Sequence, residues 1–232
     1  LQHGFCCRLR HQPRGAIKAL KASFPSITLA NSEEEAAGEG IVFIALHPPA
    51  IAETLGKIKG KLAADAIVVS LAPKVSIEKI SAMLGVERIV RLIPNATSFI
   101  NQGYNPITFA STLSGQDKSR VMELLEPLGK TFEVPEAKLE SYTILSAMLP
   151  TYFWFQWKEL LSIGREIGLT ESEGQETIQE TLTAAMNLMF QSGLTPDQVM
   201  DLIPVKPLAE HEAQIAECFR SKLIPLFEKI KP

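Results

Sequence analysis

A polar side chain that could bind a ligand follows shortly after a mostly apolar run, residues 89–93. The aliphatic and β-branched side chains of this run predict a strand that is covered on both faces. Pro94 ends the strand because it has no N–H to donate, and Asn95 follows with an amide that can donate and accept. Ligands bind at the carboxyl ends of strands in an open parallel α/β sheet. Asn95 is therefore a candidate site residue, although Pro-Asn is also an ordinary turn signal.

On both sides of Asn95, expected strands alternate with expected helices up to Pro135. The expected strands are residues 5–10, 27–30, 41–46, 66–72, 88–94, 107–111 and 131–135. The expected helices are residues 14–24, 49–62, 76–84 and 115–128, and Ser114 with Asp117 resembles a capping box at the start of the last one. Short apolar strands that alternate with helices predict a mainly parallel, Rossmann-like sheet over residues 1–135.

After Pro135 the strand signals stop, and residues 136–232 are expected to form a small all-α domain. A long helix is predicted over residues 137–167, closed by Gly168, and a second from Thr170 to a stop at Gly193. Thr195-Pro196 starts a third helix, and a last one covers residues 208–229.

Composition excludes several classes of function. The net charge of −3 over 232 residues gives no reason to expect nucleic acid or an anionic membrane as a partner. No apolar run approaches the ~20 residues of a membrane span, and no secretory signal is visible. Cys6, Cys7 and Cys218 lack zinc-site spacing, so no metal site is expected, and we interpret them as reduced, mostly buried thiols of a cytoplasmic protein.

A dinucleotide-binding sheet normally opens with a strand and a Gly-x-Gly-x-x-Gly turn before its first helix. The sequence has no such turn, and Gly38 and Gly40 come before a strand instead of after one. The expected strand at residues 5–10 would then correspond to the second strand of a doubly wound sheet. The first strand of such a sheet is the central one, and without it two inner strand edges would be left unpaired. Either an upstream segment supplies the central strand, or residues 1–10 take a different position. The sheet is thus expected to be incomplete at its N-terminal end.

Several short segments, in the same order, resemble pyrroline-5-carboxylate reductase from that family's second strand onward. The segments, with the family pattern in parentheses, are residues 10–13 (Asn-Arg-Thr-Pro), 42–48 (Val-Phe-Leu-Ala-Val-Lys-Pro), 68–77 (Val-Ser-Ile-Ala-Ala-Gly-Val-Thr-Ile), 91–95 (Arg-x-Met-Pro-Asn), 128–130 (Val-Gly-Lys) and 191–196 (Glu-Ser-Gly-x-x-Pro). The resemblance implies a Rossmann-like domain, an all-α dimerisation domain and a nicotinamide cofactor. The coenzyme-F420-dependent NADP oxidoreductases share the same nucleotide domain.

The departures from this pattern fall where the substrate would bind. The family's Leu-Ser-Gly-Ser-Gly-Pro-Ala-Tyr corresponds to residues 145–152, where Ala147 and Leu149 replace the glycines and Met148 replaces the second serine. The family's Ser-Pro-Gly-Gly-Thr-Thr segment contacts the imino-acid carboxylate, and the corresponding residues 203–208 supply neither the hydroxyls nor the glycines. A site without these donors should not hold a carboxylate tightly. We therefore expect a reductase of a different small substrate.

The resemblance and the positions together give the candidate site. The expected catalytic residues are Asn95 and Ser146, and Ser146 could instead bond the backbone of its own helix. No Asp or Glu ends the first expected strand, so Arg10 and Arg14, which flank the turn after it, suit the 2′-phosphate of NADP. The alternative is that both arginines are solvated at the surface. His47 replaces the family's lysine and could line the nicotinamide pocket or cap its loop. The full set of expected cofactor-binding residues is Arg10, His11, Arg14, Ala45, Leu46, His47, Pro48 and Asn95.

Two functions from different classes remain open. One is an NADP-dependent oxidoreductase that passes a hydride to a C=N or C=O bond, with NADPH bound if an upstream Gly-rich loop exists and no cofactor otherwise. The other is a catalytically inactive, cofactor-free relative that acts as a dimeric binding or scaffold protein. In both cases we expect a homodimer through residues 136–232, because the apolar helix faces exceed what this domain can cover alone.

Overall fold

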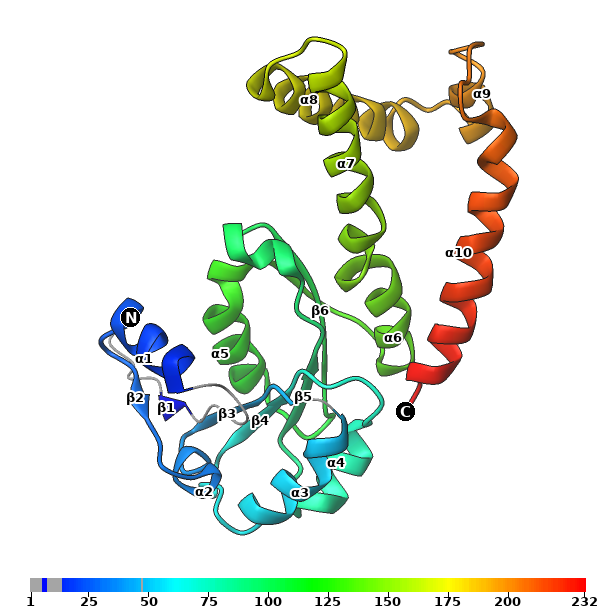
Figure 1. Cartoon of the computed structure of the whole chain (residues 1–232). Helices are drawn as coiled ribbons and strands as arrows, with labels where there is room; N and C mark the ends of the chain where they lie inside the picture. The colour runs from blue at the N-terminus through cyan, green and yellow to red at the C-terminus, as the bar shows by residue number, and fades with distance from the viewer. Residues whose placement is uncertain (1–5, 8–13, 47) are drawn as a thin grey trace. The chain divides into compact units, whose positions relative to one another are not determined.

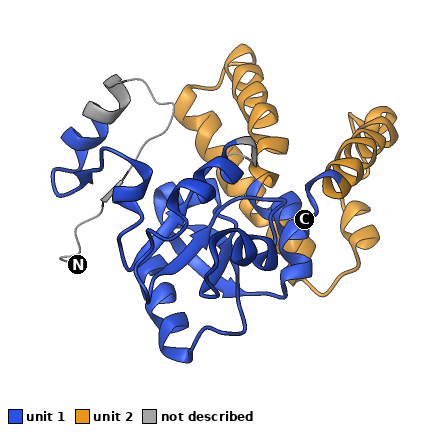
Figure 2. Cartoon of the chain, turned by 90° about the horizontal axis from the view of Figure 1, so that it is seen from below, with its two compact units in different colours: residues 1–147, 229–232 blue, residues 148–228 orange. Residues whose placement is uncertain are grey.

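The computed structural model describes residues 6–7, 14–46 and 48–232. The chain forms two compact units (Figure 2). Unit 1 contains residues 1–147 and 229–232, and unit 2 contains residues 148–228.

Unit 1 is built on a five-stranded sheet in the order β3-β4-β5-β6-β7 (Figure 1). Its strands are β3 (Ile41–Ile44), β4 (Ile67–Ser70), β5 (Ile89–Leu92), β6 (Gly103–Phe109) and β7 (Gly129–Glu133). All neighbours are parallel except β5 and β6, which are antiparallel. Every residue of β4 and β5 is buried, so these two strands are covered on both faces as predicted. The mainly parallel α/β class predicted from the sequence is confirmed.

Helices α3 (Pro48–Ile58), α4 (Ile77–Leu84) and α5 (Gly115–Leu125) pack on this sheet through apolar residues such as Leu55, Ile80 and Val121. Ser114 and Asp117 form both hydrogen bonds of the predicted capping box. The Ser114 hydroxyl, followed by the Arg88 side chain, holds the pKa of Asp117 below its usual range. The sequence analysis missed α2 (Glu33–Ala36), because one turn is too short to show a helical period.

The first two strands form a separate small sheet. Strand β1 (Cys6–Cys7) pairs in parallel with β2 (Thr28–Leu29), and α1 (Arg14–Ser23) connects them in the chain. Among the described residues, no strand pairs with the outer edge of β3. Residues 6–7 therefore lie beside β2 and not beside β3.

The first part of the expected long helix stays with unit 1. Residues 137–167 were predicted as one helix, but the structure has a 3₁₀-helix (Glu136–Lys138), α6 (Leu139–Tyr142), a π-helix (Thr143–Ala147) and α7 (Leu149–Glu166). The division between the units falls between Ala147 and Met148 instead of at Pro135. The physical reason is a set of polar contacts that hold residues 136–147 to the strands, described below.

Unit 2 contains α7, α8 (Glu171–Gln191), α9 (Pro196–Met200) and most of α10 (Ala209–Ile230). Capping boxes at Thr170 and Thr195 confirm the two predicted helix starts. In residues 148–228 the only buried positions are Gly164 and Gly174. Cys218 is exposed, so the expectation of mostly buried thiols is wrong for this residue, because its face of α10 is not covered. No helix among the described residues is long and apolar enough to cross a membrane.

Candidate functional site

Asn95 lies at the carboxyl edge of three parallel strands, β3, β4 and β5. Strand β5 ends at Leu92, just before Pro94, and Asn95 is the N-cap of a 3₁₀-helix, Ala96–Ile100. The Asn95 Oδ1 atom accepts hydrogen bonds from the Thr97 N–H at 3.0 Å and from the Thr97 hydroxyl at 2.8 Å. The Pro-Asn pair therefore does form a turn, and the turn lies at the predicted edge.

The structure brings together the two residues proposed as catalytic. The Asn95 amide nitrogen donates to the backbone oxygen of Ser146 at 3.0 Å and to its Oγ at 3.1 Å. The Ser146 hydroxyl donates to the backbone oxygen of Tyr104 at 2.8 Å, so it does not bond its own helix. Both residues are buried, and a π-helix, a feature often found at functional sites, carries Ser146.

These contacts limit what Asn95 can do for a ligand. Its two amide hydrogens and its oxygen are all engaged within the chain. A ligand could bind the amide only by breaking one of these hydrogen bonds. The geometry therefore makes Asn95 a positioning residue that joins the end of β5 to the π-helix, and the catalytic role expected of Asn95 and Ser146 stays a prediction.

Asn105 supports the same turn and was missed by the sequence analysis. It lies in β6, and its Oδ1 accepts from the Asn95 N–H at 2.8 Å and from the Ser98 hydroxyl at 3.3 Å. Asn105 is 1% exposed, and its Nδ2 has no hydrogen-bond partner. No signal pointed to Asn105, because the strand was expected over residues 107–111 and β6 begins earlier, at Gly103.

A buried ionic network lies beneath this edge. Arg91 in β5 donates from Nη1 to Glu136 Oε1 at 3.0 Å and from Nη2 to Glu140 Oε1 at 2.5 Å. The side chains of Arg91 and Glu140 are 1% and 3% exposed, and that of Glu136 is 33% exposed. Glu136 Oε1 also accepts from the Ile77 N–H at 2.8 Å, at the start of α4. The network holds residues 136–147 to the sheet and explains why the unit boundary lies beyond Pro135.

Only part of the expected cofactor-binding set can be placed. Ala45 and Leu46 follow β3, so they lie at the same edge as Asn95, with Ala45 exposed and Leu46 half-buried. Arg10, His11 and His47 lie outside the described residues. Arg14 begins α1 and Pro48 begins α3, and their side chains lie outside the described part of the chain.

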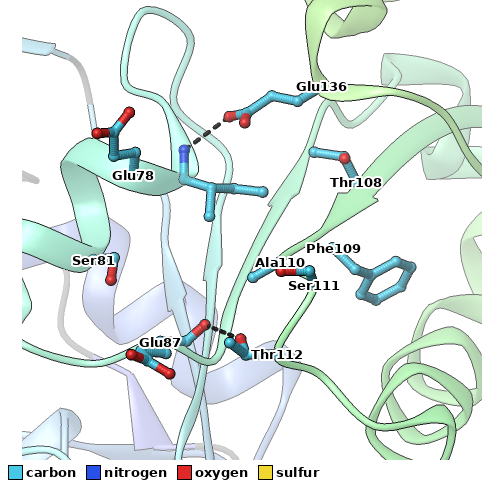
Figure 3. A pocket seen from close by; sticks show the side chains of 10 residues that line it. Glu78, Ser81, Glu87, Thr108, Phe109, Ala110, Ser111, Thr112 and Glu136 are labelled. Atoms are coloured by element: carbon cyan, nitrogen blue, oxygen red, sulfur yellow. Dashed lines mark hydrogen bonds between the residues drawn. The ribbon is translucent and has the colours of Figure 1, made fainter.

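A hollow of about 500 Å³ lies elsewhere on unit 1, along α4 and the end of β6 (Figure 3). Because β6 runs antiparallel to β5, the lining residue Phe109 pairs with Val90 near the beginning of β5, away from Asn95. Glu78, Glu87 and Glu136 give the hollow an acidic wall. Glu136 is paired with Arg91, but the carboxylates of Glu78 and Glu87 leave the lining acidic and repel a phosphate, so this hollow does not suit a dinucleotide. Among the described residues, no group of three or more His, Cys, Asp or Glu could hold a metal ion.

Comparison with known proteins gives one consistent result. No family model matches the chain. Curated relatives include the pyrroline-5-carboxylate reductase of Corynebacterium melassecola, 25% identical over 195 residues, which cover 82% of this chain and 71% of the relative. Those of Pisum sativum and Escherichia coli K12 are 22% and 21% identical, covering 78% and 81% of this chain and 67% and 70% of the relatives.

Solved structures of pyrroline carboxylate reductases have a similar fold. The pyrroline carboxylate reductase of Plasmodium falciparum, with NADP bound, has a TM-score of 0.75 at 19% identity, covering 97% of this chain and 84% of that one. The Streptococcus pyogenes enzyme has a TM-score of 0.71 at 19% identity, covering 98% and 85%. The resemblance stated from the motifs is confirmed, and so is the Rossmann-like domain followed by a helical domain.

Proposed function

We propose that this protein is an NADP-dependent oxidoreductase that transfers a hydride to a C=N or C=O bond of a small substrate. The observation that carries the proposal is sequence similarity to pyrroline-5-carboxylate reductases over 82% of the chain. The carboxyl edge of β3, β4 and β5 gives the cofactor its expected place, because dinucleotides lie across this edge in doubly wound sheets. The cofactor would carry the hydride, and the chain would position and orient it.

The proposed cofactor is NADPH, with Arg10 and Arg14 on its 2′-phosphate and with Ala45, Leu46, His47 and Pro48 beside its nicotinamide half. Pyrophosphate binding needs backbone N–H groups at a helix N-terminus, which a Gly-rich turn usually presents. We therefore expect tight binding only where such a turn completes the sheet next to β1 and β3. Without it, two arginine–phosphate contacts at the ~1 kcal/mol typical of surface ion pairs fall far short of the about 8 kcal/mol of micromolar binding.

The substrate is proposed to differ from the imino acid of the relatives. Residues 203–208 contain two prolines and no hydroxyl group, and Ile203, Val205 and Leu208 are exposed by more than 60%. Such a segment lacks the hydroxyl donors of the family, and its one ammonium, that of Lys206, already lies 3.9 Å from Asp201 Oδ1. A small C=N or C=O compound whose polar groups are held elsewhere fits this segment better. A cytoplasmic location belongs to the same proposal.

We further propose that the protein is a homodimer through residues 136–232. Unit 2 has no buried large side chain and exposes many, including Phe153, Trp154, Phe155, Met186 and Phe190. Because a fully accessible aromatic side chain presents ~150–250 Å², the exposed side chains of unit 2 add up to on the order of 1,000 Å². A stable interface needs about 800 Å² from each partner, so a second copy is the natural cover. Light scattering that gives a monomer at micromolar concentration would remove this part of the proposal.

The cofactor proposal is tested by calorimetric titration of NADPH and NADH, with NADPH oxidation followed in parallel. The titration compares the 232-residue chain with a version that has a strand and a Gly-rich turn joined before Leu1. The extended version should bind NADPH and prefer it to NADH, and Arg10→Ala with Arg14→Ala should abolish the preference. Lys158→Ala, which removes an exposed cation of α7, is the matched control. Absence of any nicotinamide binding by either version would favour the cofactor-free scaffold instead.

A further inference from the structure

Lys74 lies between β4 and α4 with an unusual backbone conformation. Its φ is 71°, and Asn101 is the only other described non-glycine residue with positive φ. Asparagine tolerates this left-handed region, but a lysine there is strained because its Cβ crowds the following carbonyl. The family pattern given above has glycine directly before the valine that Val75 matches, so Lys74 stands where glycine would be unstrained. Strained residues of this kind cluster at functional sites.

Lys74 is at the edge where the proposed chemistry takes place. Strands β4 and β5 are parallel neighbours, with Ser70 opposite Arg91. Lys74 follows the carboxyl end of β4 as Asn95 follows that of β5. Because this pair of strands lies on the β3–β5 side of the sheet, Lys74 belongs to the half that receives the nicotinamide and substrate, not the half that holds the adenosine.

The Lys74 side chain is half-buried, and it has no hydrogen bond or ion pair among the described residues. The other polar groups of this region are engaged. Asn95 and Ser146 bond each other, and Glu136 accepts from Arg91 and from the Ile77 N–H. The Lys74 ammonium is therefore a cation available to an incoming anion.

We propose that Lys74 binds a carboxylate of the substrate whose C=N or C=O bond is reduced, and this proposal rests on the proposed function. An ammonium and a carboxylate form a charge-assisted hydrogen bond, which is stronger than a neutral one. The substrate class is thus an imino or oxo acid whose carboxylate is held after β4, instead of by residues 203–208. This placement reconciles an acidic substrate with a segment that lacks the family's hydroxyl donors.

The test uses pairs of probes that differ only in the carboxylate or its charge. They are pyrroline-5-carboxylate with 1-pyrroline, and pyruvate with its neutral amide. Lys74→Gly and Lys74→Ala should raise the KM of the acidic member roughly tenfold, as for loss of one charged hydrogen bond, and leave kcat within about twofold. Lys74→Arg should keep the KM within about threefold of wild type, and the neutral member should respond to none of the variants.

A stability measurement separates the effect of losing the ammonium from the effect of relieving the backbone strain. Lys74→Gly removes the strain and should raise Tm by ~2 °C, whereas Lys74→Ala keeps the left-handed strain and should not. A variant that is more stable yet binds the acid less well cannot owe its loss to misfolding.

Equal effects on both members of a pair, or no effect on either, would overturn the assignment. A change in NADPH affinity alone would also overturn it, because the cation would then hold a cofactor phosphate. If the chain shows no turnover, calorimetric titration measures its binding of the acidic probes instead. Lys74-dependent binding without NADPH oxidation would support the anion site and refute the reductase, and a wild-type chain that binds neither member would overturn the inference.

Discussion

Replacement of Arg91 by methionine is expected to destabilise unit 1 strongly. The substitution removes the ion-pair partner of Glu140, whose side chain is 3% exposed. A buried carboxylate left without its partner costs ~3–5 kcal/mol, a large share of the 5–15 kcal/mol that stabilises a typical domain. Glu136 loses the same partner, but it keeps the Ile77 N–H and is 33% exposed, so water compensates much of its loss.

Two further variants make this prediction sharp. In Arg91→Met with Glu140→Leu, both buried charges are replaced by apolar groups, and most of the lost stability should return. Arg88→Met is the matched control, because its ion pair with Asp117 is more exposed to solvent than the Arg91–Glu140 pair, with side chains 32% and 14% exposed, and should contribute less to stability.

The assay is urea unfolding followed by circular dichroism, with hydrogen exchange of β5 to localise the change. Tryptophan fluorescence is unsuitable for unit 1 because the two tryptophans, Trp154 and Trp157, are both in unit 2. The reasoning would be refuted if Arg91→Met and the Arg88→Met control lost the same stability, or if the double variant were no more stable than Arg91→Met alone.

Three other predictions concern local contacts in unit 1. Ser146→Ala should lower the free energy of unfolding by ~1–2 kcal/mol in a urea titration, because the buried Ser146 hydroxyl bonds the Asn95 amide and the backbone oxygen of Tyr104. A loss below ~0.3 kcal/mol would contradict this. Gly103→Ala should lower the free energy of unfolding by ~3 kcal/mol or more, because the added Cβ would lie 2.0 Å from a hydroxyl oxygen and 2.5 Å from a backbone oxygen. In the control Gly115→Ala, the added Cβ meets nothing within 4 Å, so this variant should be as stable as wild type. The lowered pKa of Asp117 means that its cap stabilises the fold above the ordinary value of 3.8 and is lost as pH falls through the lower folded value. The Tm difference between wild type and Asp117→Asn should therefore close under acid, and a difference that is constant with pH would disprove the role of the charge.

Local signals in the sequence predicted the fold well. The capping residues Ser114, Thr170 and Thr195 were correct because a cap depends only on residues up to three positions away. Strands β4 and β5 were recognisable because a strand covered on both faces must be apolar along its length. The edge that carries Asn95 followed from these strands and from Pro94.

Contacts between distant residues could not be predicted in the same way. The π-helix and the position of the unit boundary depend on Arg91 reaching Glu140, 49 residues later. The sequence also gives no sign that the Asn95 amide is fully engaged, because its partner Ser146 lies 51 residues away. The left-handed conformation of Lys74 was hidden as well, since lysine is not a residue that signals positive φ.

The polar contacts between the strands and residues 136–147 also constrain how the chain folds during synthesis. Arg91 and Asn95 leave the ribosome long before their partners, which follow 45 to 51 residues later. Until then the guanidinium of Arg91 must stay hydrated, so β5 cannot be sealed into a dry core. Non-local contacts of this kind slow folding because a long loop must close before they form. We therefore expect the sheet of unit 1 to remain open until about residue 147 has emerged, and the docking of residues 136–147 onto it to be a slow step in the folding of this unit.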